Sequence, residues 1–261
     1  MSAGAGTTSA FGQSMARLRS AQKSSKGAPP YSLFINRPLG RILAAAAYQV
    51  GMTPNQVTYV SAACTLAGLL VLGLGPAGIW TGVGVAALLV LGYALDSADG
   101  QLARLRGGGS LLGEWLDHMI DSVKVVTLHL AVLVAMYRFT DVDRHWLLVP
   151  LVFAVVSAVH FFGMILNDLV AREQRALAGR PAGPKVPAST VRSLTKLPTD
   201  YGVLCLAFLL LGSIGAFTVV YTILALATTG YTVLVARKWY GDVRRLDAER
   251  SAALLVGGAA R

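Results

Sequence analysis

Long apolar runs separated by short polar segments occupy the chain from about residue 56 to residue 237. A helix needs about 20 apolar residues to cross a bilayer core roughly 30 Å thick. Six runs approach this length, at residues 56–75, 79–104, 112–137, 146–171, 201–215 and 217–237. The pattern predicts an all-α integral membrane protein with six transmembrane helices. Gly212 and Gly215 lie between the short fifth run and the sixth, where they allow a tight turn.

The segments around these runs divide the chain into four parts. Residues 1–30 are rich in Ala, Gly and Ser and predict a flexible cytoplasmic tail. Asn36 can cap a helix, so residues 31–51 predict a short amphipathic helix at the membrane interface, with a juxtamembrane linker as the alternative. Residues 52–240 form the six-helix transmembrane domain, and residues 241–261 form a cytoplasmic C-terminal tail.

The composition agrees with a membrane protein. Hydrophobic residues make up 54% of the chain and charged residues 14%, which excludes an ordinary soluble domain. The net charge of +10 suits nucleic acid or anionic lipid, and the apolar composition favours lipid, so we expect no nucleic acid partner. Cys64 and Cys205 lie far apart in apolar runs, which excludes a disulfide framework and a cysteine-rich metal site.

The basic residues predict the orientation. All but three of the 23 Lys and Arg residues lie in the two terminal segments or in the loops near 104–111 and 172–200. Lys124 lies within a run, and Arg138 and Arg144 lie in a loop on the opposite side. Six spans put the basic segments on one side, which the positive-inside rule makes cytoplasmic. We therefore expect a multi-pass protein of the cell membrane with both termini in the cytoplasm.

Four carboxylates lie at the ends of two successive apolar runs. Asp96 and Asp99 are about 60° apart around one helix, and Asp117 and Asp121 are about 40° apart around the next. A short loop brings the two pairs together near the cytoplasmic edge of the bilayer. Ionised carboxylates beside hydrocarbon cost at least ~2.5 kcal/mol each and repel one another, so a divalent cation is the expected partner. All-oxygen ligands favour Mg²⁺, Mn²⁺ or Ca²⁺ over zinc.

Basic neighbours offer these carboxylates an alternative. The aspartates either bind metal, or pair with Arg104, Arg106 and Lys124, or line a path for cations. Lys124 follows Asp117 and Asp121 by seven and three residues, so it shares their helix face. We expect Lys124 chiefly to neutralise carboxylates.

The acidic segment also carries a longer pattern, D-x2-D-G-x2-A-R-x8-G-x3-D-x3-D, with eight fixed positions within 26 residues. The fixed positions are Asp96, Asp99, Gly100, Ala103, Arg104, Gly113, Asp117 and Asp121. This pattern resembles the signature of the CDP-alcohol phosphotransferases, also called CDP-alcohol phosphatidyltransferases. The six-run hydropathy between about residues 50 and 237 is also similar to that family.

The resemblance implies an enzyme of phospholipid biosynthesis. Such an enzyme cleaves the diphosphate of a CDP-linked donor, releases CMP and transfers the substituted phosphate to an alcohol hydroxyl. It implies that Asp96, Asp99 and Asp117 hold one or two Mg²⁺ or Mn²⁺ ions, and that Asp121 is the general base and also contacts metal. It further implies a homodimer. The residue types agree, because metal ions neutralise a diphosphate and a base activates a hydroxyl.

The remaining signature positions suit the nucleotide and its phosphates. Gly100 and Ala103 are small where a nucleotide approaches the helix, with close helix packing as the alternative role. Arg104 suits a fork of hydrogen bonds to phosphate, with snorkelling at the interface as its alternative. We expect Gly113 to let the next helix pack near the metal ions.

A second segment, Pro54-Asn-Gln-Val-Thr58, opens the first run and resembles the Pro-Asn-x-x-Thr entry that is common in the same family. Asn55 and Thr58 are therefore expected to bind nucleotide or phosphate. The alternative is helix capping after Pro54.

The loop from Arg172 to Lys196 is basic and rich in Gly and Pro. Such a loop suits a phosphorylated polyol such as inositol phosphate or glycerol phosphate, and contact with anionic head groups is the alternative. We predict acceptor binding by Lys124, Arg172, Arg175, Arg192 and Lys196. This assignment favours CDP-diacylglycerol as donor over a soluble CDP-alcohol that reacts with a lipid alcohol.

Two functions of other classes compete with the enzyme. Intramembrane carboxylates also occur in cation transporters and channels, but the other runs offer no acidic relay to the far side. A non-catalytic lipid-binding scaffold leaves the aspartate set unexplained. His118, His129 and His160 show no metal-ligand spacing, so we expect them to form hydrogen bonds between packed helices.

Overall fold

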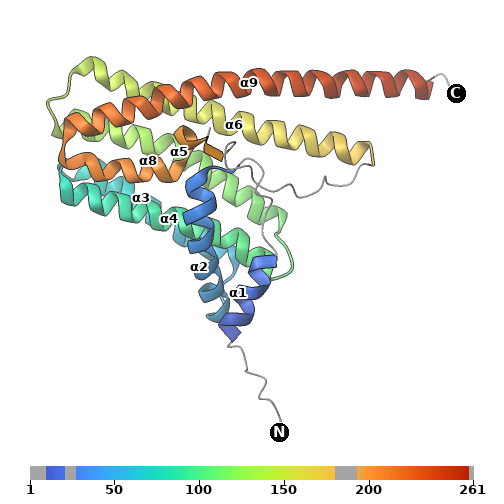
Figure 1. Ribbon diagram of the computed structural model, residues 1–261, viewed down its shortest axis with the longest axis horizontal. Helices are drawn as coiled ribbons and strands as arrows, with labels where there is room; N and C mark the ends of the chain where they lie inside the picture. Colours follow the sequence, from blue (N-terminus) through green and yellow to red (C-terminus); the bar gives the residue numbers. More distant parts are fainter. Residues whose placement is uncertain (1–9, 21–27, 180–192, 195, 259–261) are drawn as a thin grey trace, which may run out of the picture.

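The computed structural model describes residues 10–20, 28–179, 193–194 and 196–258, and no strand occurs among them. Five of its helices are long and apolar enough to cross a membrane, and they pack as a bundle (Figure 1). These helices are α3 (Pro54–Leu74), α4 (Ile79–Leu105), α5 (Leu111–Phe139), α6 (Leu148–Leu177) and α9 (Ile214–Gly258). Most of each apolar stretch is not buried inside the bundle, as expected for helices that face lipid.

Local signals explain where the helices around the acidic segment begin. Thr53 caps α3 in a reciprocal arrangement with Gln56, in which each side chain accepts a hydrogen bond from the other residue's backbone N–H. Ser110 caps α5 by accepting a hydrogen bond from the Gly113 N–H. Between α4 and α5, Gly107 has a φ of +100°, which favours glycine. This turn returns α5 beside α4.

The predicted fifth run forms a shorter apolar helix. It consists of α8 (Tyr201–Ala207) and the 3₁₀-helix η4 (Phe208–Gly212), and it is followed by α9 after a break at Ser213. The predicted turn between the last two runs is therefore present. At Gly82 of α4 a Cβ would collide with the carbonyl oxygen of Phe208, so glycine is needed for this close packing. Two further 3₁₀ turns, η2 (Arg144–Leu147) and η3 (Leu197–Thr199), precede α6 and α8.

The N-terminal part differs from the predicted flexible tail. Residues Ala10–Ser20 form helix α1, whose Leu18 is fully buried. This side chain packs in a small second core with Ala44 and Leu102, which offsets the cost of ordering the segment. Helix α2 (Arg37–Gln49) follows the π-helical turn η1 (Ser32–Asn36) and supplies the helix expected in that region.

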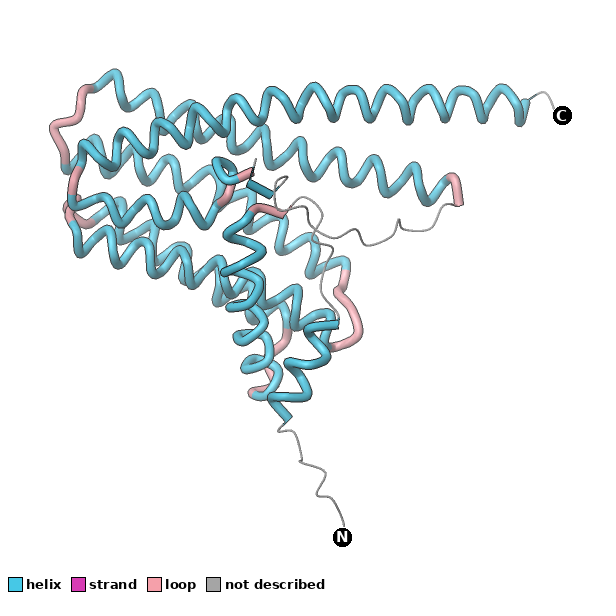
Figure 2. The backbone as a smooth tube through the Cα atoms, viewed as in Figure 1, coloured by secondary structure: helices cyan, strands magenta, loops and turns pink. Residues whose placement is uncertain are grey.

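Helix α9 is the longest element of the fold. It is 45 residues long, and it packs along α6 and then extends past the rest of the bundle (Figure 2). The segment after residue 240, predicted to be a C-terminal tail, therefore continues as helix to Gly258.

Candidate metal and substrate site

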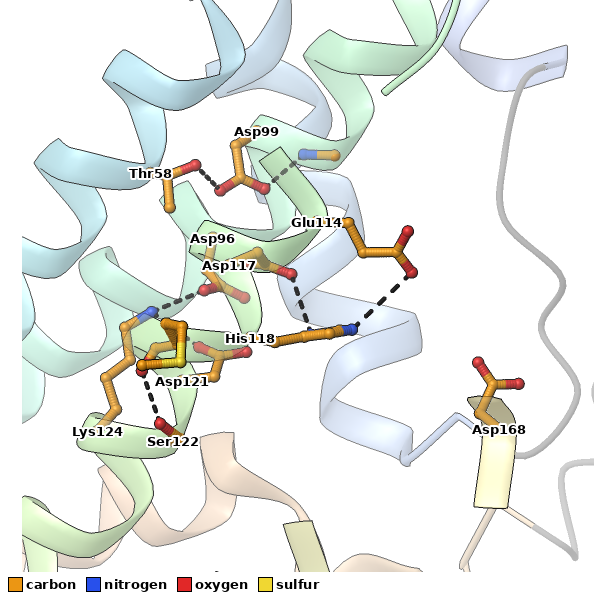
Figure 3. A network of polar contacts seen from close by, with 12 residues as sticks. Thr58, Asp96, Asp99, Glu114, Asp117, His118, Asp121, Ser122, Lys124 and Asp168 are labelled. Carbon is orange, nitrogen blue, oxygen red and sulfur yellow. Dashed lines mark hydrogen bonds and ion pairs between the residues drawn. The ribbon is translucent and has the colours of Figure 1, made fainter. Parts of the chain in front are cut away.

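Three of the four predicted carboxylates come together between α4 and α5. One carboxylate oxygen from each of Asp96, Asp117 and Asp121 lies within 4.8 Å of the others (Figure 3). Asp96 comes from the last turns of α4, and the other two come from the first half of α5. The turn that contains Gly107 thus places the acidic faces of α4 and α5 against each other, as the spacing of the aspartates predicted.

Lys124 forms ion pairs with two carboxylates of the same cluster. Its Nζ lies 2.7 Å from Asp96 Oδ1, 3.1 Å from Asp121 Oδ1 and 3.3 Å from Ser61 Oγ. Ser61 in turn donates to the carbonyl oxygen of Gly92, at 2.8 Å, so its oxygen accepts from the ammonium. Lys124 is 9% exposed, and each of its three N–H groups has an acceptor. The side chain therefore ties α3, α4 and α5 together.

Asp99 does not join the cluster of three. Its Oδ2 accepts a hydrogen bond from Thr58 Oγ1 at 2.6 Å, and its Oδ1 accepts one from the backbone N–H of Gly100. The residue is buried between α4 and α3, whereas the other three carboxylates lie between α4 and α5 (Figure 3). The expected convergence of four carboxylates is therefore met by three, because Thr58 offers the fourth a partner on a different helix.

The donor set fits a hard divalent cation. All of its ligand atoms are carboxylate oxygens, which Mg²⁺ and Mn²⁺ prefer. Asp96, Asp117 and Asp121 contribute three negative charges and Lys124 one positive charge, so the ionised cluster carries a net charge of −2. One divalent ion would neutralise that charge.

Two of the predicted nucleotide-binding positions are glycines, and their surroundings differ. A Cβ at Gly100 would meet only Arg104 Nη1, at 3.5 Å, so helix packing does not require glycine there. At Gly113 a Cβ would lie 3.2 Å from Asn55 Oδ1, so glycine brings the start of α5 close to the start of α3. Ala103 is half-buried on α4.

Arg104 has a buried N–H group, at Nε, that forms no hydrogen bond among the described residues. A buried, unpaired guanidinium N–H is costly unless a ligand completes it. This is the arrangement expected of a side chain that binds an anionic group.

Two of the predicted acceptor-binding arginines, Arg172 and Arg175, are not at the cluster. Arg172 forms ion pairs of 2.6 Å with Glu114 and with Asp168, and both carboxylates lie outside the cluster (Figure 3). Arg175 is exposed, and its Nε donates to a backbone carbonyl of its own helix. Arg192 lies outside the described residues. Of the predicted set, Lys124 and Lys196 border the site.

A cavity of about 350 Å³ adjoins the acidic cluster. Asp96, Asp121 and Lys124 line it, and α6, α8 and α9 supply much of the remaining wall. Sequence reasoning missed most of this wall, which includes Tyr93, His160, Asp200, Tyr201, Thr228 and Tyr231. In an apolar run such aromatic and hydroxyl residues look like ordinary packing residues.

The position of Asp200 in the sequence predicts a helix cap. It directly precedes an apolar helix, which is the position of an N-cap, and its carboxylate accepts a hydrogen bond from the Gly202 N–H. The same carboxylate accepts a 2.7 Å hydrogen bond from the Tyr31 N–H. Burial raises the pKa of Asp200, while these hydrogen bonds oppose the rise. The carboxylate therefore joins the start of α8 to the N-terminal segment.

Part of the chain resembles a curated protein. A stretch of 84 residues is 39% identical to the phosphatidylinositol phosphate synthase of Mycolicibacterium smegmatis (strain ATCC 700084 / mc(2)155). It covers 32% of this chain and 36% of the relative, so the match spans about a third of each protein.

Two solved structures share the fold, and both are of phosphatidylinositol phosphate synthase from Mycobacterium tuberculosis. The complex with manganese and citrate has a TM-score of 0.53 and 24% identity over 79% of this chain and 89% of that one. The form with CDP-DAG bound has a TM-score of 0.52 and 23% identity over 79% and 94%. The CDP-alcohol phosphatidyltransferase family profile matches residues 51–236, well over half of the chain, and includes both helices of the acidic cluster. The chain therefore belongs to the CDP-alcohol phosphatidyltransferase family.

Proposed function

We propose that this protein transfers a substituted phosphate from a CDP-linked donor, CDP-diacylglycerol, to a hydroxyl of a polyol or polyol phosphate. CMP is released, and the product is a phospholipid. The observation that carries the proposal is the three-carboxylate cluster, which borders a cavity in a chain of this family. The form of the mycobacterial synthase with CDP-DAG bound supports the choice of donor.

Asp96, Asp117 and Asp121 would hold the metal, Mg²⁺ or Mn²⁺, as one or two ions. The manganese complex of the mycobacterial synthase supports this assignment. Bound there, the metal supplies positive charge that neutralises the diphosphate and stabilises the departing CMP. Asp99 is assigned to the same metal site by its place in the signature, and Thr58 fixes its orientation.

The nucleotide and its phosphates are assigned to the cytoplasmic ends of α3, α4 and α5. The unpaired Nε of Arg104 donates to a donor phosphate oxygen. The open helix surface at Gly100, with the small Ala103 on the same helix, lets the nucleotide approach. Asn55 lies at the entry of α3 beside Gly113 and completes this end of the site.

Asp121 acts as the general base. It borders the cavity, and Lys124 holds one of its oxygens at 3.1 Å. The acceptor hydroxyl gives its proton to the Asp121 carboxylate, its oxygen bonds to the donor phosphorus, and the bond between that phosphorus and the CMP oxygen breaks. Fixing the donor and the acceptor on opposite sides of the cluster supplies the positioning that such a displacement needs.

The membrane arrangement is part of the proposal. The helix Tyr201–Gly212 makes the sixth pass, and the acidic cluster and both termini face the cytoplasm, as the distribution of basic residues supports. Helix α2 lies at the interface, where its exposed apolar side chains Leu39 and Ile42 contact lipid. The protein acts as a homodimer within the membrane.

The test is CMP release by purified protein with Mg²⁺, CDP-diacylglycerol and a panel of polyols and polyol phosphates. We expect CMP and a new phospholipid, identified by mass, and we expect both to disappear when EDTA removes the metal. A parallel reaction pairs a soluble CDP-alcohol with diacylglycerol. The proposal is wrong if CDP-diacylglycerol yields no CMP with any acceptor.

A further inference from the structure

Residues 29–36, which we call the strap, lie beside the cavity that adjoins the acidic cluster. Pro29 lines this cavity, and so does Asp200, the residue that binds the strap. The strap has a buried side and an exposed side, since Tyr31 is 7% exposed whereas Phe34 is 66% exposed. It therefore forms an outer layer over part of the cavity wall and carries an apolar surface on its outside.

The carboxylate of Asp200 fastens the strap to the start of α8. Asp200 is 2% exposed, and its Oδ2 accepts the 2.7 Å hydrogen bond from the Tyr31 N–H. Its Oδ1 accepts a hydrogen bond from the Gly202 N–H at 3.2 Å. Each oxygen thus has its own role, because Oδ2 holds the strap and Oδ1 caps the helix. A shorter side chain with one oxygen could keep the cap and release the strap.

Aromatic rings continue this attachment toward the acidic cluster. The Tyr31 ring packs directly on Gly202, where a Cβ would collide with it, so glycine is required at this position. Tyr31 also stacks on Tyr93, with ring centroids 6.1 Å apart, and Tyr93 meets Tyr201 edge to face at 5.1 Å. Tyr93 and Tyr201 line the same cavity as Asp96. The strap is therefore joined through packed rings to the wall beside the carboxylates.

Water competes with every alcohol acceptor in the proposed reaction. A water molecule can give its proton to the Asp121 carboxylate while its oxygen bonds to the donor phosphorus and the bond from that phosphorus to the CMP oxygen breaks. The products are then CMP and phosphatidic acid, so the donor is consumed without transfer. Enzymes suppress such side reactions by closing the reaction site against bulk water.

We propose that the strap, held in place by Asp200, excludes bulk water from the reaction site, so that transfer to an alcohol outcompetes hydrolysis of the CDP-linked donor. Asp200 is a positioning residue, because it acts through the strap and not on the reacting atoms. The inference rests on the proposed function and adds to it the part of the protein that protects the donor.

The experiment measures how the donor divides between transfer and hydrolysis in Asp200→Ser. Serine keeps an oxygen that caps α8 but is too short to hold the Tyr31 N–H as well. Purified protein, Mg²⁺ and CDP-diacylglycerol are mixed with myo-inositol, inositol 3-phosphate, glycerol or glycerol 3-phosphate, and both lipid products are quantified by mass. We expect the ratio of phosphatidic acid to transfer product to be at least about tenfold higher in the variant. In ¹⁸O-labelled water the additional phosphatidic acid should carry the label.

Asp143→Ser is the matched control. It makes the same change at another helix cap, where the carboxylate accepts a hydrogen bond from the His145 N–H, and Asp143 does not line the cavity. This variant should keep the wild-type ratio of phosphatidic acid to transfer product.

A second variant releases the strap without altering Asp200. Gly202→Ala places a methyl group where the Tyr31 ring now lies, so the ring must move away from α8, and the same ratio should rise. Its control is Gly230→Ala on α9, where an added Cβ meets no atom within 4 Å and the ratio should stay at the wild-type value.

The outcomes separate the inference from the proposed function. An unchanged ratio in Asp200→Ser overturns the inference and leaves the proposed function standing, even if total turnover falls. If Asp200→Ser yields no CMP, the ratio in Gly202→Ala decides, and loss of all CMP in both variants overturns the inference in favour of a purely structural role. A wild-type protein that forms no transfer product with any of the four acceptors overturns both.

Discussion

Helix α5 carries two polar clusters inside an apolar bundle, and the clusters differ in what completes them. Near its N-terminal end, Asp117, Asp121 and Lys124 belong to a charged group that opens onto a cavity. Further along the helix, His129 is 2% exposed and forms hydrogen bonds on both ring nitrogens, to Tyr221 Oη at 2.6 Å and to Ser157 Oγ at 3.0 Å.

The two clusters differ in whether other residues of the protein complete their hydrogen bonds and balance their charge. The imidazole of His129 also stacks on Phe153, with ring centroids 4.0 Å apart, so this cluster is neutral and satisfied within the chain. The acidic cluster keeps a net charge of −2 after Lys124 is counted. A satisfied cluster stabilises the packing of helices, whereas a cluster with surplus charge is ready to bind a ligand.

The largest expected effect comes from Asp121→Asn. Loss of the general base should lower kcat by about 10²–10⁴-fold. Mn²⁺ and the CDP-linked donor should still bind through Asp96 and Asp117, with an Mn²⁺ affinity about tenfold lower because one of three carboxylate charges is lost. CMP release and Mn²⁺ titration measure the two effects. The matched control is Asp141→Asn in an exposed loop, which should keep wild-type activity, and comparable activity in the Asp121 variant would remove this residue from the base role.

A smaller effect is expected for Lys124→Gln, and this variant should bind Mn²⁺ more tightly than the wild type. The ammonium competes with a divalent ion for Asp96 and Asp121, so its removal leaves a more negative cluster. Affinity for Mn²⁺ should rise about tenfold, well within the several kcal/mol that one charge contributes at such distances. Titration followed by electron paramagnetic resonance measures this affinity.

Lys124→Arg is the control for that change, because it keeps the positive charge and should keep the affinity near the wild-type value. Turnover should fall in Lys124→Gln, since Asp121 loses the partner that orients it. Weaker Mn²⁺ binding in Lys124→Gln would contradict the competition and leave Lys124 with a purely structural role.

The smallest effect on activity is expected at the neutral cluster. Tyr221→Phe leaves His129 Nδ1 without its partner in an apolar core, which should cost about 1–3 kcal/mol of stability. The unfolding temperature in detergent should fall while kcat stays near wild type. Tyr240→Phe, at a side chain that is 73% exposed, is the control and should change neither quantity. A large loss of kcat with unchanged stability would show that the two clusters are not as different as their geometry indicates.

Local patterns were sufficient to predict the parts of the molecule that depend on neighbouring residues. The spacing of Asp96, Asp117 and Asp121 predicted their meeting, because helix periodicity and one short turn determine it. The two glycines Gly212 and Gly215 likewise predicted the break between η4 and α9.

Contacts between residues far apart in the chain could not be predicted from local sequence patterns. Asp99 turns toward Thr58, a residue 41 positions earlier, and no local signal reports which of two helices a buried carboxylate will face. Helix α1 carries only three large apolar side chains, Phe11, Met15 and Leu18, at helical spacing, and burial of Leu18 against α2 and α4 accounts for its order. The cavity wall combines six helices, so its composition emerges only when they pack.

The length of α9 has a practical consequence. With 45 residues it spans about 67 Å, roughly twice the thickness of a bilayer core. The part of α9 after Trp239, which still contacts α6, is mostly exposed and extends past the other helices as a stiff rod (Figure 1). A cysteine introduced at the exposed Arg250 would be reachable by a bulky, membrane-impermeant label without disturbing the cavity, and labelling in intact cells versus lysed cells would report sidedness directly.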